Sequence, residues 1–241
     1  MMRSPISAIL GLALLLFSGC ATPSTSPGDQ ASDVLRAAKA ASGGAAWDQL
    51  TGAYEKGSHS GIPYQTWVDF RQYGMRVESQ RGDIRVAQGY DGQIAWRKMG
   101  DRTMTISDAG ALSEARISAY VSNNAYFFPD RFTASFTYLG TKSEADRTFE
   151  GIEAQPEGAR AVRLWFDRRT HLLAQIDDFA GTPAVIVNLS DYRRIGPVLI
   201  AHYGTITDAA GTILETNEVT HTILQDNAPE IFAPPAPVPS P

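Results

Sequence analysis

The sequence predicts a mainly β protein, of the α+β kind, in which a few helices cover one large curved antiparallel sheet. Three observations support this prediction. From Ala53 onward apolar and polar residues alternate with a period of two, turn residues separate the alternating runs, and only a few short segments have the longer period of a helix. Strict alternation is typical of antiparallel strands with one face in water. We expect about ten or eleven strands and two or three helices.

The chain begins with a segment typical of an export signal. A basic start at residues 1–3 precedes an apolar run from Ile6 to Phe17, and two small residues then precede Cys20, the single cysteine of the chain. The run is well short of the ~20 residues that a membrane-spanning helix needs. The segment resembles the lipobox of bacterial lipoproteins, although leucine is commoner than phenylalanine at position 17. The resemblance implies that residues 1–19 are removed and that Cys20 carries a covalent diacylglycerol. The alternative is an ordinary signal peptide with a chance cysteine.

The expected lipid determines where the protein resides. Two or more acyl chains hold a protein firmly on a membrane without a spanning helix. In lipoproteins an aspartate after the cysteine often retains the protein in the inner membrane, so Ala21 is compatible with the periplasmic face of the bacterial outer membrane. Residues 20–30 contain no large apolar side chain, and we expect them to form the acylated cysteine and a flexible tether. Without a second cysteine, stability must come from a core.

The charge of the mature chain disfavours two classes of partner. Once Arg3 is removed with the signal segment, 20 basic residues face 26 acidic ones, a formal net charge of −6. Nucleic acids require clustered Lys and Arg, so we expect no nucleic-acid partner. The same charge disfavours electrostatic docking on anionic lipid and leaves membrane attachment to the acyl anchor. We expect a monomer.

The folded region is predicted to begin with a helix. Ser32 is a suitable N-cap, and the glycines at positions 43 and 44 end the helix because glycine tolerates a left-handed backbone. A second short turn places Trp47 and Leu50 on one side. The apolar stripe of the first helix consists of Val34, Leu35 and Ala38.

The predicted strands are short alternating runs joined by turns. Asp91-Gly92 predicts a two-residue hairpin because both residues favour positive φ, and Asp167–Thr170 joins two later runs as a second hairpin. Successive strand residues point to opposite faces, so Tyr64 and Val68 share a face. The runs lie at 62–70, 74–80, 83–90, 93–99, 131–140, 147–154, 160–167, 172–179, 184–193, 198–207 and 212–224.

A predicted helix over 110–125 interrupts the strands, and aromatic side chains are concentrated directly after it. Pro129 ends this segment because proline cannot continue a helix. A wide curved sheet has too large a concave face for its own side chains to fill, so helices must cover it. The aromatic groups form either the wall of an apolar pocket or solid core, and both interpretations stay open. The candidate ligand-binding residues are Trp96, Tyr120, Tyr126, Phe127, Phe128, Phe132 and Phe136.

Four short motifs indicate a family by their order and spacing. They are Gly43-Gly44-Ala45-Ala46-Trp47, then Gly89-Tyr90-Asp91-Gly92 before Trp96, then Leu164 to Asp167 with Thr170 and Leu172, and Asp191-Tyr192-Arg193 before Gly196. With them, residues 31–232 resemble the LolA-like superfamily. The resemblance implies an unclosed β-barrel whose concave side holds a hydrophobic cavity covered by helices. Members carry lipoprotein acyl chains or hold lipids. The proline-rich residues 233–241 are predicted to be a disordered tail.

The sequence contains no arrangement that favours catalysis or metal binding. The four histidines are not spaced like metal ligands; His202 and His221 lie on neighbouring predicted strands, but a histidine satisfied within its strand is the favoured interpretation. Asp177 and Asp178 point to opposite faces and cannot act together. Gly-x-Ser-x-Gly, phosphate-loop and dinucleotide motifs do not occur in the sequence. We therefore expect no enzyme activity, no metal, and no cofactor apart from the covalent lipid on Cys20.

These observations lead to one hypothesis and one alternative. The hypothesis is a lipid-anchored, non-catalytic envelope protein that binds a hydrophobic small molecule or a lipoprotein acyl chain in the concave side of a half-barrel. The alternative is an accessory lipoprotein with a solid core, whose surface binds another envelope protein.

Overall fold

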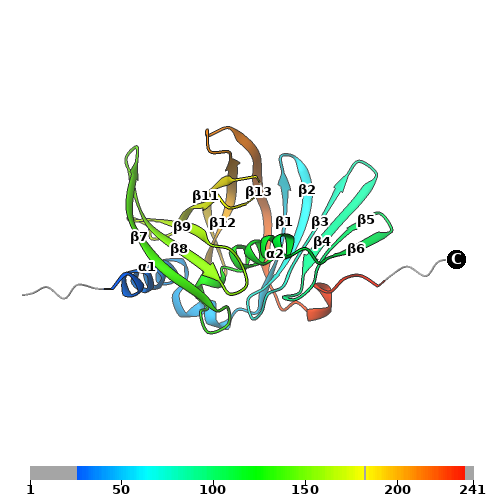
Figure 1. Ribbon diagram of the computed structural model, residues 1–241, viewed down its shortest axis with the longest axis horizontal. Helices are drawn as coiled ribbons and strands as arrows, with labels where there is room; N and C mark the ends of the chain where they lie inside the picture. The colour runs from blue at the N-terminus through cyan, green and yellow to red at the C-terminus, as the bar shows by residue number, and fades with distance from the viewer. Residues whose placement is uncertain (1–25, 182, 237–241) are drawn as a thin grey trace, which may run out of the picture.

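One antiparallel sheet of thirteen strands forms the body of the protein (Figure 1). The computed structural model describes residues 26–181 and 183–236, so the predicted signal segment and Cys20 lie outside the described residues. The strand order is β6-β5-β4-β3-β2-β1-β13-β12-β11-β10-β9-β8-β7. Because β6 and β7 are the two edges and do not pair with each other, the sheet is an unclosed barrel. The predicted fold class is confirmed.

Strands that follow each other in the sequence pair within each half of the sheet, β6 and β7 are edge strands that do not pair with each other, and the β1–β13 pair joins the two halves. We call β1–β6 the first wing and β7–β13 the second wing. The strand bounds are β1 Gly52–His59, β2 Ile62–Asp69, β3 Met75–Arg81, β4 Ile84–Tyr90, β5 Ala95–Met99, β6 Arg102–Ile106, β7 Ala134–Glu144, β8 Arg147–Pro156, β9 Val162–Asp167, β10 Leu173–Asp178, β11 Val185–Ile195, β12 Val198–Thr207 and β13 Ile213–Leu224.

Two of these strands were not resolved by the alternation of the sequence. β1 carries Glu55 on the same face as Ala53 and bulges at Gly57, so its apolar pattern is interrupted. β6 has only five residues, of which Met104 and Ile106 are the apolar ones. The other eleven strands correspond to the predicted runs.

The first helix begins earlier than predicted. α1 spans Pro27–Ser42, and the Ser26 side chain caps it by accepting from the Asp29 backbone N–H at 3.2 Å. Ser32, the predicted N-cap, lies inside the helix and donates to the Gly28 carbonyl oxygen. Residues 27–30, assigned to the tether, are therefore helical, because Ser26 followed by a proline is the stronger start signal.

The end of this helix and the following turn agree with the prediction. Gly43, at φ +144°, caps α1, and a 3-10 helix, η1 (Gly44–Gln49), follows directly. Trp47 of η1 is 1% exposed, and its indole N–H donates to the Ser42 hydroxyl at 3.0 Å. The predicted stripe of α1 is buried, with Ala31 in addition.

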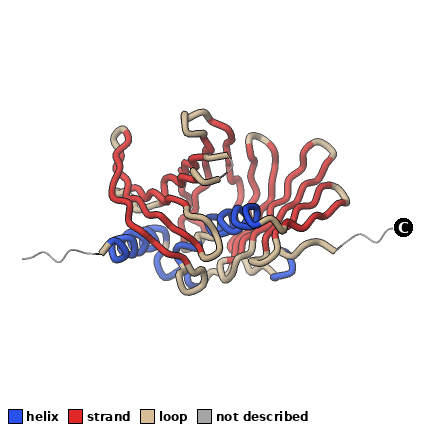
Figure 2. Tube along the Cα trace, viewed as in Figure 1, coloured by secondary structure: helices blue, strands red, loops and turns tan. Residues whose placement is uncertain are grey.

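The second helix connects the two edges of the sheet. α2 (Ala109–Ser122) follows β6, crosses the concave side between the wings, and leads through η2 (Ala125–Phe127) to β7 (Figures 1 and 2). Its N-cap is Asp108, whose carboxylate accepts from the Ala111 backbone N–H at 2.9 Å. Its buried residues, Ile117, Ala119 and Tyr120, belong to the same core as the inward faces of the strands. No helix in the described part of the chain is long and apolar enough to cross a membrane.

The two predicted hairpins differ in their outcome. Asp167 turns β9 into β10 as predicted, and its carboxylate accepts from the backbone N–H groups of Arg169 and Thr170, each at 2.9 Å. The β4–β5 connection has four residues, 91–94, rather than two. Gly92 has φ +101°, but Asp91 instead accepts from two backbone N–H groups of the turn, which lengthens it.

Candidate functional site

The strand register shows which side chains line the concave face of the sheet, because residues that lie opposite each other on paired strands point to the same face. Ala53 lies opposite Val68 and Leu224, so these three side chains share the inner face. The same register places Met75 opposite both Val68 and Tyr90. The inner face therefore runs continuously across both wings, and α2 covers its middle.

Aromatic rings from η1, the end of β2, α2 and the segment around η2 fill one end of the concave face. We call this cluster the aromatic floor. Trp47 contacts Phe70 and Phe127 with ring centroids 5.6 Å apart in each case, and Tyr126 lies 4.7 Å from Phe127. The Trp47–Phe70 and Tyr126–Phe127 contacts are edge-to-face, an arrangement that stabilises beyond simple burial. The members of the floor are Trp47, Phe70, Tyr120, Tyr126, Phe127, Phe128 and Phe132, each at most 7% exposed.

Little space remains beside this floor. A void of about 20 Å³ is bordered by Trp47, Tyr126, Phe127, Leu173 and Tyr192, among others. This volume holds about one water molecule. The rings are therefore packed as core in this structure.

Two buried hydroxyl groups lie in the floor or beside it. Tyr120, fully buried, and Tyr73 have hydroxyl groups without a hydrogen-bond partner among the described residues. Burial raises the pKa of Tyr73 to about 12 and raises that of Tyr120 further. Both groups stay neutral and add polarity without charge.

Arginines fasten α2 to both wings. Arg116 donates to the Tyr90 hydroxyl at 2.9 Å and to the Gly92 carbonyl in the first wing, and to the Glu157 carbonyl at 2.6 Å beside the second. Arg160 binds Glu114 of α2 and Asp178 of β10, and these hydrogen bonds raise its pKa. The helix is therefore held as a strap across the concave side.

Beyond the strap, the first wing exposes apolar side chains on its inner face. Ile84, Met99 and Met104 are 51%, 43% and 54% exposed, and Val77 and Val86 beside them are half-buried. The register confirms one face, because Val86 lies opposite Met99. These five side chains form an uncovered apolar surface, which we call the open wing.

A polar row crosses the middle of the concave face. Glu55 lies opposite Thr66 on one neighbouring strand and opposite Thr222 on the other. The Thr222 hydroxyl oxygen lies 3.3 Å from Nε2 of the buried His202. Burial raises the pKa of Glu55 to about 7, against a weaker opposing effect of the Thr222 hydrogen bond. Among the described residues, no cation lies within ion-pair distance of Glu55.

The structure separates the predicted ligand-binding residues into three places. Five of them, Tyr120, Tyr126, Phe127, Phe128 and Phe132, lie together in the aromatic floor. Phe136, on the edge strand β7, packs half-buried against the core.

Trp96, the seventh residue, lies on the outer face of the sheet. It pairs with Gly89, while its neighbour Ala95 pairs with the inward Tyr90. The segment around η3 (Pro229–Ile231) covers it, and its indole N–H donates to the Phe232 carbonyl at 2.7 Å. Trp96 therefore does not reach the concave face.

The histidines and carboxylates considered in the sequence lie on different faces of the sheet or point apart. His202 is on the inner face, whereas His221, opposite Lys56, is on the outer face. Asp177 accepts from Trp165 on the outer face, and Asp178 binds Arg160, so the two carboxylates point apart as predicted. No group of three or more metal-ligating side chains occurs in residues 26–181 and 183–236.

A larger groove of about 550 Å³ lies over β1–β4, away from the aromatic floor. Its lining is largely polar and includes Lys56, Gln65, Glu78, Gln80 and Arg85. Such a lining does not suit an acyl chain. The open wing is the better candidate for an apolar ligand.

Two features of the site were missed in the sequence. Glu55 was passed over because β1 was not resolved as a strand. The open wing was seen as alternation, but the sequence does not show which apolar face a helix leaves uncovered. The signal for Glu55 was an acid at an inward position between Ala53 and Gly57.

Comparison with known proteins supports the fold. No protein-family model matches the chain, and no curated protein sequence matches it. Several solved structures are similar, and three of them are described here. A DUF1329 family protein from Desulfovibrio piger has 11% identity and a TM-score of 0.57, with 87% of this chain and 98% of that one covered. A LolA superfamily protein from Nitrosomonas europaea has 14% identity and a TM-score of 0.56, with 84% and 97% covered. An outer membrane lipoprotein-sorting protein domain from Vibrio parahaemolyticus has 10% identity and a TM-score of 0.55, with 83% and 94% covered.

These likenesses define the class of architecture. The chain has the unclosed half-barrel fold seen in LolA superfamily and DUF1329 family structures.

Proposed function

We propose that this protein is a lipid-anchored, non-catalytic lipoprotein of the periplasmic face of the outer membrane, and that it binds a hydrophobic acyl ligand on the concave face. The observation that carries the proposal is the open wing. Three large apolar side chains on one inner face are between 43% and 54% exposed. Covering each of them with an acyl chain contributes on the order of 1 kcal/mol.

The rest of the concave face supports this position for the ligand. The open wing forms one wall of a trough on the concave side. α2 forms the opposite wall of this trough, and the aromatic floor closes one end of it. Because the floor is packed, an acyl chain in this proposal lies along the open wing, with the floor at its inner end. The LolA superfamily likeness is consistent with such a ligand.

A fluorescent fatty acid tests the proposal directly. We expect saturable binding by the parent protein and at least tenfold weaker binding by the double variant Met99→Gln, Met104→Gln, from about 1 kcal/mol for each side chain. Ile223→Gln is the matched control, because Ile223 is 42% exposed on the outer face. The absence of probe binding by the parent, with no lipid in organic extracts of the natively purified protein, would reject an acyl ligand.

The anchor requires its own experiment. We expect Cys20→Ala to abolish labelling by palmitate and to release the protein from the membrane fraction. Full membrane retention of the variant would contradict the anchoring proposal.

A second candidate function is an accessory lipoprotein with a solid core that binds another envelope protein. The packed aromatic floor, with its void of about 20 Å³, favours it. A parent protein that binds no fatty acid would shift the assignment to this role.

A further inference from the structure

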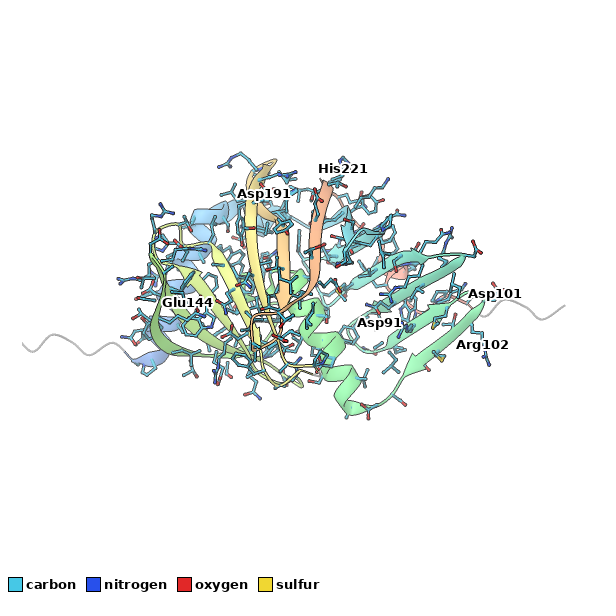
Figure 3. The ribbon with its side chains drawn as sticks, turned by 90° about the horizontal axis from the view of Figure 1, so that it is seen from above. Asp91, Asp101, Arg102, Glu144, Asp191 and His221 are labelled. Carbon is cyan, nitrogen blue, oxygen red and sulfur yellow. The ribbon has the colours of Figure 1, made fainter. Side chains whose placement is uncertain are left out.

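Two neighbouring hairpin tips of the first wing combine cations with apolar side chains. We call residues 81–85, at the β3–β4 turn, and 97–104, at the β5–β6 turn, the basic tip. Both turns lie at the same end of β4, because Val86 near its start pairs with Ser79 and with Met99. Figure 3 places Asp101 and Arg102 at the outer end of the β5–β6 hairpin.

The charge of the basic tip is opposite to that of the chain. Its acids are Asp83 and Asp101 alone, whereas the whole chain has a formal net charge of −5. In the described residues, none of its cations forms an ion pair with a carboxylate. These cations are Arg81, Arg85, Arg97, Lys98 and Arg102.

The strand register interleaves three of these cations with the exposed apolar side chains. Arg81 lies opposite Ile84. Met99 lies opposite Arg102, and Arg97 lies opposite Met104. Opposite residues of an antiparallel pair share a face, so all six side chains project from the inner face of the wing.

We propose that the basic tip docks on an anionic phospholipid surface. Such a surface presents phosphates directly above an apolar layer, and the tip presents guanidinium groups beside Ile and Met side chains. Arginine binds phosphate oxygens through two parallel hydrogen bonds. The apolar side chains then enter the boundary between headgroups and acyl chains. A nucleic acid would not use the apolar side chains.

This docking has a consequence for the proposed ligand. The side chains that contact the bilayer belong to the open wing, so the trough opens onto the membrane. An acyl chain leaving the bilayer reaches the concave face without crossing water. Docking of the basic tip on a membrane does not require the proposed acyl ligand, so the two properties can be tested separately.

Vesicle sedimentation tests the inference with the mature chain, residues 20–241, carrying Cys20→Ala, so that neither the apolar run at residues 6–17 nor an acyl anchor contributes. We expect binding to phosphatidylcholine vesicles that contain phosphatidylglycerol, and much weaker binding to pure phosphatidylcholine. Each cation at an anionic surface strengthens binding about fivefold, so Arg81→Gln with Arg97→Gln and Arg102→Gln weakens it about a hundredfold. Raising the salt concentration should also weaken the binding of the parent protein to these vesicles, because salt screens the attraction between the arginines and the anionic lipid.

The matched control removes the same charge elsewhere. Arg168→Gln, Arg169→Gln and Arg194→Gln change three exposed arginines outside the tip, and we expect parent-like binding. Equal binding to both kinds of vesicle, or equal loss in both triple variants, would overturn the proposal. Sedimentation without vesicles would also overturn it and indicate a second copy of the chain as the occupant. Fatty-acid binding is measured separately on the triple variant of the basic tip. If that variant loses vesicle binding but binds the fatty acid like the parent, membrane docking and acyl-ligand binding are shown to be distinct properties.

Discussion

Replacing Glu55 by glutamine should stabilise the protein at alkaline pH. Glu55 lies half-buried between Thr66 and Thr222, and burial raises its pKa from 4.5 to about 7. A carboxyl group whose folded pKa is raised favours folding while it is neutral. Its contribution is therefore complete below pH 4.5 and is lost as the pH rises through 7. Glutamine keeps the shape and the hydrogen bond to Thr222 and has no charge to desolvate.

The magnitude follows from the pKa difference. The interval between 4.5 and about 7 corresponds to about 3 kcal/mol at about 1.4 kcal/mol per pKa unit. Because the side chain is half-buried, water screens part of this penalty, and we expect about 2 kcal/mol. For a chain of this size that gain raises the melting temperature by about 4–8 °C.

Urea denaturation of the parent and of Glu55→Gln at pH 5 and pH 8 measures the effect. We expect nearly equal free energies of unfolding at pH 5 and a more stable variant at pH 8. His59 titrates in both proteins and cancels in the comparison. Glu218→Gln, an exposed residue of β13, is the control and should leave the pH dependence unchanged. A parent and a Glu55→Gln variant with parallel pH profiles would refute the argument.

Four further substitutions test the core and one turn. Phe127→Ala and Phe128→Ala should each lower the free energy of unfolding by about 3–5 kcal/mol, since both rings are packed, whereas parent-like melting would mean a compliant pocket wall. Tyr120→Phe should raise it by about 1–2 kcal/mol, because an unpartnered buried hydroxyl is removed; a loss would reveal a bound water or partner. Gly92→Val should lower it by about 1–3 kcal/mol, since φ is +101° and the added Cβ would lie 3.2 Å from the Tyr73 carbonyl oxygen. An unchanged melting temperature for Gly92→Val would contradict that strain.

The elements with regular alternation could be predicted, and those without it could not. The runs around Tyr64, Met75 and Leu164 gave their strands and their inward faces because a buried face imposes a period of two. β1 was missed because Glu55 occupies an inward position, and β6 because five residues carry little pattern. The helix start at Ser26 was missed because the tether composition obscured the Ser-Pro signal.

The prediction for Trp96 was based on its aromatic side chain, whereas the alternation of faces along the strands would have placed it correctly. Tyr90 is inward, and any even-numbered turn between β4 and β5 places Ala95 on the face of Tyr90 and Trp96 on the other. The strand period was therefore sufficient to assign Trp96 to the outer face. Its aromatic character suggested a ligand contact, whereas the C-terminal segment covers it.

Composition disfavoured an anionic membrane as a partner, and the fold reverses that argument locally. A net charge describes the average surface, but a docking site experiences only charges within about 10 Å, because salt screens the rest. Folding places Arg81, Arg97 and Arg102 on one face at adjacent turns, whereas acids such as Glu144, Asp191 and Asp91 lie elsewhere on the molecule (Figure 3). No sequence average contains this arrangement, because it depends on the register of β3–β6. The membrane proposal therefore depends on strand pairing rather than on composition, and shifting that register by one residue would move the arginines to the other face.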